Sequence, residues 1–211
     1  MQRKLLHGWI ENAHDKVNKE RQEDAMETLP SLGDMPDGPF PCFIEFRMTD
    51  QERFHVLCQA FEILKHEKLQ YLEPVLGEEV NEAENNHEQT LHKLVDTLFD
   101  VFDERALAHF WWPSQQELNA YVNQWQATPV PQRFTDPTLE HPWDFESMVD
   151  CLLNGEYELV SCSFWTPDTG VLEFSPFAFP YGGTGCMKAL IEAFDGEVIG
   201  EDDGTGYVSS L

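Results

Sequence analysis

The chain has 211 residues, of which 41% are hydrophobic and 12% aromatic, so it can bury a core and wholesale disorder is excluded. It carries 39 acidic against 13 basic residues, a formal net charge of −26, and this sign opposes direct nucleic-acid binding, which relies on Lys and Arg at the phosphates. The imbalance is greatest in residues 134–211, where Lys188 stands alone against fifteen Asp and Glu.

The N-terminal residues and the cysteines indicate the cellular compartment in which the protein is expected. Residues 1–15 interrupt their apolar stretch at His7 and Gly8, so they do not resemble a signal-peptide core. No run approaches the ~20 apolar residues that a membrane span needs. The five cysteines include no C-x-x-C pair and predict free thiols. We therefore expect a soluble protein in a reducing cytoplasm, with no membrane partner.

The first predicted elements are a helix and a strand. Apolar residues at helical spacing predict a helix over residues 2–28 with one narrow buried stripe. Prolines and glycines in residues 29–41 interrupt regular structure after it. The sequence CFIEFRM then predicts a short strand over residues 42–48.

Two long helices are predicted next. The first begins at Thr49, which fits a capping box with Glu52, and ends near Lys68. The second runs from about residue 79 to residue 102 and has one apolar side. Together they make the first two-thirds of the chain mostly helical.

A third helix and a connector follow. The helix begins at Ser114 with Glu117 as its capping-box partner. It is expected to bury four side chains: Leu118, Tyr121, Val122 and Trp125. Four prolines in residues 127–142 then predict an extended connector.

The last part of the chain alternates helix and strand. A short helix is predicted over residues 145–153 and a β-hairpin over residues 156–179. The Gly-rich turn PYGGTG, residues 180–185, leads into a helix that ends at Asp195-Gly196. A third strand is predicted over residues 197–200.

These elements predict an α+β fold, with a mostly helical N-terminal portion and a small C-terminal sheet built from the hairpin and one further strand. The organisation is a helical portion over residues 1–126, a connector over residues 127–142 and an α/β portion over residues 143–211. A single continuous domain is also compatible with the sequence.

The Gly-rich turn is a first candidate site, because a strand, a Gly-rich loop and a helix N-terminus can present backbone N–H groups to an anion. It lacks the spacing of nucleotide-binding motifs, and its surroundings are acidic. A tight structural turn is the favoured interpretation. Cys186, in the first turn of the following helix, is a candidate nucleophile.

A second candidate site is the E-x-x-H pair formed by Glu84 and His87, a spacing that places two metal ligands on one face of a helix. Glu11 and His14 repeat the spacing. Solvated helix ends are the favoured explanation of these pairs, so no metal and no cofactor is assigned.

The third candidate is an acidic face near the C-terminus, in which carboxylates surround an aromatic side chain. We expect it to combine the tail with the hairpin through six binding residues: Glu201, Asp202, Asp203, Asp168, Glu173 and Tyr207. Its charge would attract a cationic partner.

Two functions follow from these candidates. The favoured one is an acidic binding protein that inhibits or neutralises a basic macromolecule, such as a toxin or nuclease, in the manner of an immunity protein or a nucleic-acid mimic. The alternative is an enzyme or metal-binding protein that uses Glu84 and His87, or the Gly-rich loop with Cys186. The sequence favours a non-enzymatic role and assigns no catalytic residue.

Overall fold

The computed structural model describes residues 42–72, 80–133, 135–179 and 181–210. The predicted helix over residues 2–28, with its Glu11 and His14, lies outside these ranges. Within them, no helix is both long and apolar enough to cross a membrane. These residues belong to a compact unit that begins at Pro41.

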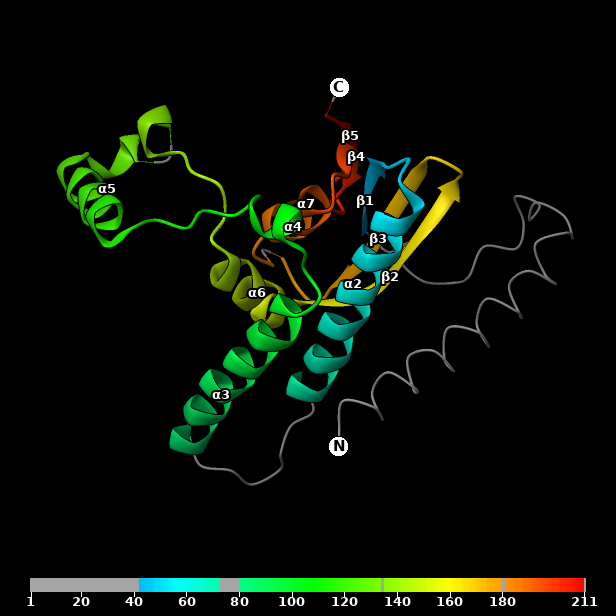
Figure 1. Cartoon of the computed structure of the whole chain (residues 1–211), viewed down its shortest axis with the longest axis horizontal. Coiled ribbons are helices and arrows are strands. Elements are labelled where there is room, and N and C mark those ends of the chain that lie inside the picture. Colours follow the sequence, from blue (N-terminus) through cyan, green and yellow to red (C-terminus); the bar gives the residue numbers. More distant parts are fainter. Residues whose placement is uncertain (1–41, 73–79, 134, 180, 211) are drawn as a thin grey trace, which may run out of the picture. The chain divides into compact units, whose positions relative to one another are not determined.

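The centre of this unit is an antiparallel sheet of five strands in the order β2-β3-β1-β4-β5 (Figure 1). The strands are β1 (Cys42–Arg47), β2 (Tyr157–Thr166), β3 (Thr169–Pro176), β4 (Glu197–Asp202) and β5 (Tyr207–Ser209). The first strand in the chain is therefore the middle strand of the sheet, between two strands that follow it by more than a hundred residues.

Side chains alternate along β1 because successive residues of a strand point to opposite faces. Cys42, Ile44 and Phe46 are buried and belong to the core. Phe43 and Glu45 point to the other side, which we call the open face. One face of the sheet thus builds the core and the other carries mixed aromatic and charged side chains.

Helices complete the core. Helix α2 (Gln51–Leu72) contacts β2, and α7 (Gly185–Ala193) contacts β4. Helix α6 (Phe145–Asn154) contacts both of these helices, and α3 (Val80–Phe99) contacts α2 and α6 (Figure 1). A short helix, α4 (Glu104–Leu107), lies against α7. The predicted α+β fold is confirmed.

Most predicted elements are present, and the local differences are the cap of α2, the unpredicted short helix α4 and the unpredicted strand β5. The cap of α2 is Asp50, whose carboxylate accepts hydrogen bonds from the backbone N–H groups of Glu52 and Arg53, so the capping box predicted at Thr49 is wrong. The short edge strand β5 was not predicted from the sequence. It begins only three residues after Gly204, too close to the turn for a pattern of alternating residues to develop.

The predicted burial of the third helix is also wrong. Helix α5 (Gln115–Ala127) has the expected capping box between Ser114 and Glu117, yet no residue of this helix is buried. Leu118 is 37% exposed and Val122 is 40% exposed. In Figure 1 the helix projects away from the sheet. Its apolar residues do not reach the core because the helix packs on the segment that follows it.

That segment, the predicted extended connector, contains two 3-10 helices, η1 (Val130–Gln132) and η2 (Pro137–Leu139). Proline fits the first turn of a helix, where its missing N–H is not needed, and Asp136 caps η2. Leu139 is buried. The connector is therefore partly packed, and the division into portions stays a prediction.

Lys68 joins α2 to the end of α6. Its side chain is 2% exposed, and its ammonium donates hydrogen bonds to the carbonyl oxygens of Leu152, Leu153 and Gly155 at 2.9, 2.9 and 2.7 Å. Its nitrogen also lies 4.6 Å from the centre of the Tyr157 ring. A cation at a helix C-terminus satisfies carbonyl groups that have no partner inside the helix.

Burial lowers the pKa of Lys68 from 10.5 to about 8. An unfolded chain therefore binds more protons than the folded chain between these values, and the contribution of Lys68 to stability grows as the pH rises through this window. Below the folded pKa, the protein bears the full cost of a buried charge.

We expect Lys68→Met to destabilise the protein at every pH, because carbonyl groups at the end of α6 lose the side chain that donates to them. The difference in unfolding free energy between wild type and variant should increase by about 2 kcal/mol from about pH 7.5 to about pH 9.5. Urea denaturation at both pH values measures it. A difference that stays constant or shrinks with rising pH would show that Lys68 is not held in a desolvated site.

Candidate functional site

The open face carries a row of residues that crosses the whole sheet. The strand register places five residues side by side, one from each strand: Ser161, Glu173, Phe43, Asp202 and Tyr207. Directly opposed residues of antiparallel strands lie on the same face. Residues far apart in the sequence, such as Phe43 and Tyr207, therefore form one continuous surface.

Three aromatic rings form a strip on this face. The ring centroids of Phe43 and Trp165 are 5.4 Å apart, and those of Phe43 and Tyr207 are 6.1 Å apart. Trp165 is 56% exposed and Tyr207 is 50% exposed, although Trp and Tyr are large side chains that are usually well covered. We call these three residues the aromatic strip.

Tyr207 is held in place at two points. Its ring lies over Gly200, where a Cβ atom would come within 2.1 Å of the Tyr207 hydroxyl oxygen. Its O–H donates a hydrogen bond of 2.6 Å to the carboxylate of Glu45. This bond is the main reason that the pKa of Tyr207 is raised, because it stabilises the protonated phenol.

Carboxylates flank the aromatic strip. Strand alternation and register put five on the open face: Glu45, Glu158, Glu173, Glu197 and Asp202. Arg47 is the only basic residue in the described strands, and its guanidinium is bound to Glu197 at 2.9 Å. The open face is consequently acidic and aromatic, with its single cation already paired.

The structure brings together three of the six residues predicted for the acidic face, namely Glu173, Asp202 and Tyr207. Glu201 lies on the opposite face, in register with Ile44 of the core. There its carboxylate accepts hydrogen bonds of 2.6 Å from Thr184 and from Lys188. Since strand residues alternate, neighbours such as Glu201 and Asp202 cannot share a face.

Asp168 and Asp203 lie in turns at opposite ends of the sheet. The backbone carbonyl of Asp168 accepts a hydrogen bond from the N–H of Met48, just beyond one end of β1. Asp203 follows the residue paired with Phe43 near the other end, and its carboxylate accepts hydrogen bonds from Thr205. The Asp168 carboxylate accepts a hydrogen bond of 2.8 Å from the Thr166 hydroxyl. Both side chains therefore have structural roles in turns and do not join one site.

Sequence reasoning missed Phe43, Glu45 and Trp165. The alternation in CFIEFR does separate the two faces of β1, but only the pairing of β1 with β3 and β4 places Phe43 between Glu173 and Asp202. The sequence places Trp165 in the hairpin but does not tell which face of the sheet it occupies. A bulge at the end of β2 shifts the register there, and alternation alone does not reveal this shift.

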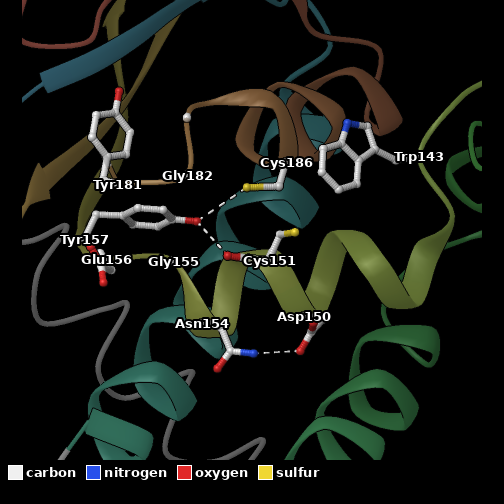
Figure 2. A pocket seen from close by; sticks show the side chains of 11 residues that line it. Trp143, Asp150, Cys151, Asn154, Gly155, Glu156, Tyr157, Tyr181, Gly182 and Cys186 are labelled. Atoms are coloured by element: carbon white, nitrogen blue, oxygen red, sulfur yellow. Dashed lines mark hydrogen bonds between the residues drawn. The ribbon is translucent and has the colours of Figure 1, made fainter. Parts of the chain in front are cut away.

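A separate pocket of about 380 Å³ lies between α6 and the Gly-rich turn (Figure 2). The Tyr157 hydroxyl donates to the Cys151 carbonyl at 3.1 Å and lies 3.4 Å from the Cys186 sulfur. The ionisable side chains of its lining also include the carboxyl groups of Asp150 and Glu156, and none of the described residues that line it is Lys, Arg or His. An anion such as a phosphate does not suit this lining.

The pocket does not activate Cys186. Burial raises the pKa of the Cys186 thiol, so the thiol stays protonated near neutral pH, although Tyr157 and backbone N–H groups act in the opposite direction. Gly182 and Gly183 adopt positive φ angles of 96° and 81°. Glycine adopts such angles readily, so the backbone conformation of the turn accounts for the two glycines.

His87 does not form a metal site with the residues that are described. Its Nε2 atom lies 3.1 Å from a carboxylate oxygen of Asp150 and 3.3 Å from the amide nitrogen of Asn154, and its ring packs near Tyr71. The structure does not describe the side chain of Glu84. Among the described residues no group of three or more His, Cys, Asp or Glu is arranged to hold a metal ion.

Comparison of the chain with models of protein families, with curated proteins and with solved structures found no match. The chemistry of the open face is therefore the basis for a functional assignment.

The hydrogen bond between Tyr207 and Glu45 gives a direct test of this face. We expect Glu45→Gln to lower the pKa of Tyr207 toward its ordinary value of about 10, because the bond to a charged acceptor is lost. NMR of ring-labelled tyrosine, assigned with Tyr207→Phe, follows the titration. Glu158→Gln, on the same face, is the matched control and should leave it unchanged. An unaltered Tyr207 titration in Glu45→Gln would refute the geometry.

Proposed function

We propose that this protein binds a basic protein through the open face of its sheet and thereby blocks or neutralises that partner. The observation that supports the proposal is the aromatic strip of Phe43, Trp165 and Tyr207 with carboxylates on both sides. Exposed aromatic residues of this kind are enriched where proteins bind one another.

The combination of rings and carboxylates fits arginine. A guanidinium stacks on an aromatic ring and at the same time forms paired hydrogen bonds with a carboxylate. Glu173 neighbours Phe43 across the strands, and Glu45 contacts Tyr207, so two of the three rings have a carboxylate beside them. The preferred partner surface is therefore one with arginines and not one that is only generally basic.

The charge of the chain supports the same class of partner. Its net charge of −26 would attract a cationic protein from a distance and accelerate association at low salt. Lys188, the only basic residue after residue 133, is bound to Glu201, and Arg47 is bound to Glu197. Little positive charge is left on this part of the molecule to oppose a cation.

The alternative function as an enzyme or metal protein has less support. Cys186 has a raised pKa, which opposes its use as a nucleophile, and His87 is engaged by Asp150 and Asn154. No observation on the described residues favours this alternative over binding.

The test uses an arginine-rich peptide as the probe. We expect the variant Glu45→Gln, Glu158→Gln and Glu173→Gln to bind it about tenfold more weakly than wild type, a loss of ~1.4 kcal/mol. The slope of affinity against salt concentration should flatten as well. Fluorescence anisotropy of the labelled peptide over a range of salt measures both quantities.

The matched control removes the same charge elsewhere through Glu88→Gln, Glu140→Gln and Glu146→Gln, at exposed positions outside the sheet. This control should retain nearly wild-type affinity. Equal losses in the two triple variants would mean that only net charge matters and would contradict a binding face. A lysine-rich peptide of equal length and charge should bind more weakly than the arginine peptide.

A further inference from the structure

Helix α2 runs antiparallel to the edge strand β2 and contacts it at successive positions along its length. Phe54 near the start of the helix stacks on Phe164 near the end of the strand, with 3.6 Å between ring centroids. Further along the helix, the Lys65 ammonium donates a 2.7 Å hydrogen bond to the carbonyl of Val160. Residue numbers rise along α2 while they fall along β2.

Cys58 and Cys162 lie between these two contacts. Cys58 follows Phe54 by four residues, about 6 Å along a helix, and Cys162 precedes Phe164 by two residues, about 6.6 Å along a strand. The two steps are nearly equal, so the register that stacks the phenylalanines also sets the cysteines opposite each other. The Cys58 thiol donates a hydrogen bond to the Cys162 carbonyl oxygen, with 3.4 Å between the sulfur and the oxygen.

We propose that Cys58 and Cys162 are a site of reversible disulfide formation, with a low-molecular-weight disulfide such as glutathione disulfide as the oxidant. This inference is independent of the proposed function. Both thiols are free in the structure and partly buried, and they link two elements that are already in contact.

The reaction balances in two exchange steps. The Cys58 thiolate, having lost its proton to solvent, attacks one sulfur of glutathione disulfide, and one glutathione thiolate leaves. The Cys162 thiolate, also deprotonated, then attacks the Cys58 sulfur of this mixed disulfide and expels the second glutathione. The leaving thiolates take up two protons. The two protein thiols are oxidised to one disulfide, and glutathione disulfide is reduced to two glutathione molecules.

The surroundings favour Cys58 as the first sulfur to react. The neighbouring Cys58 thiol and burial both raise the pKa of the Cys162 thiol, so Cys162 is protonated near neutral pH and suits the later, resolving step. A thiolate is the attacking species in exchange. Cys162 then acts as the resolving thiol, which needs to ionise only after its neighbour has formed the mixed disulfide.

The bond would have a measurable effect on stability. The two cysteines are 104 positions apart in the chain, so the disulfide would close a long loop and restrict the unfolded state strongly. We expect the melting temperature to rise by several degrees on oxidation and to return after reduction with dithiothreitol.

The competing pair is Cys151 and Cys186, since both line the pocket. Peptide mapping separates the possibilities. Trypsin leaves Cys151, Cys162 and Cys186 on one peptide, because no Lys or Arg lies between residues 134 and 187. A second protease specific for glutamate cuts at Glu156 and Glu173 and puts each of the three on its own fragment.

The experiment incubates the purified full-length chain with glutathione disulfide and measures intact mass and cross-linked fragments. We expect a loss of about 2 Da and one main cross-link, between the fragments that carry Cys58 and Cys162. Cys58→Ser and Cys162→Ser should each abolish the cross-link and the rise in melting temperature. Cys151→Ser and Cys186→Ser, as matched controls, should keep both.

Three outcomes would overturn the proposal. They are an unchanged mass, a stable mixed disulfide with glutathione without the cross-link, and a main cross-link between any other pair, including Cys151 and Cys186. If Cys162→Ser fails to fold, Cys58→Ser alone decides the question. Cys58 is only partly buried on α2, so we expect its replacement by serine to leave the protein folded.

Discussion

The alternation of side chains along β1 is the constraint on which the rest of the structure depends. Because β1 is the middle strand, its two sets of side chains define both faces of the sheet. Ile44 and Phe46 are fully buried, and the core grows around them. Phe43 and Glu45 join the strands on the other side into the open face. A shift of one residue in this register would exchange the core for the proposed binding surface.

The two faces also explain how the acidic unit that begins at Pro41 accommodates its charge. On the core side, the few charged groups have specific partners: Lys68 satisfies the end of α6, and Glu201 is bound by Lys188 and Thr184. On the open side, Glu158 and Glu197 are exposed to water, and Glu45, Glu173 and Asp202 are half-buried among the aromatic rings. Charge repulsion is thereby kept at a solvated surface, where it is weak, and remains available to attract a cationic partner.

Local patterns predicted the hairpin, α6, α7 and β4, because periodicity and turn residues are properties of short segments. The pairing of β1 was not predictable, since no local signal records which distant strands will flank it. For the candidate site, the acidic character and the choice of Glu173, Asp202 and Tyr207 came from the sequence, and the register places these three residues on the open face. The loss of Glu201 from that face, and the gain of Phe43 and Trp165, required the register. Leu118 and Val122 were expected to be buried but are exposed, because an apolar stripe on a helix does not reveal what the helix packs against.

The most direct measurement of the central claim is NMR mapping of the arginine-rich peptide on the isotope-labelled protein. The account predicts that the largest shifts occur at Phe43, Glu45, Trp165 and Tyr207, with the indole N–H of Trp165 as the clearest single signal. The core-side residues and the pocket near Cys186 should be unaffected. Shifts concentrated at that pocket or on α5, or spread evenly over every exposed acidic residue, would contradict the assignment of the open face as the binding surface.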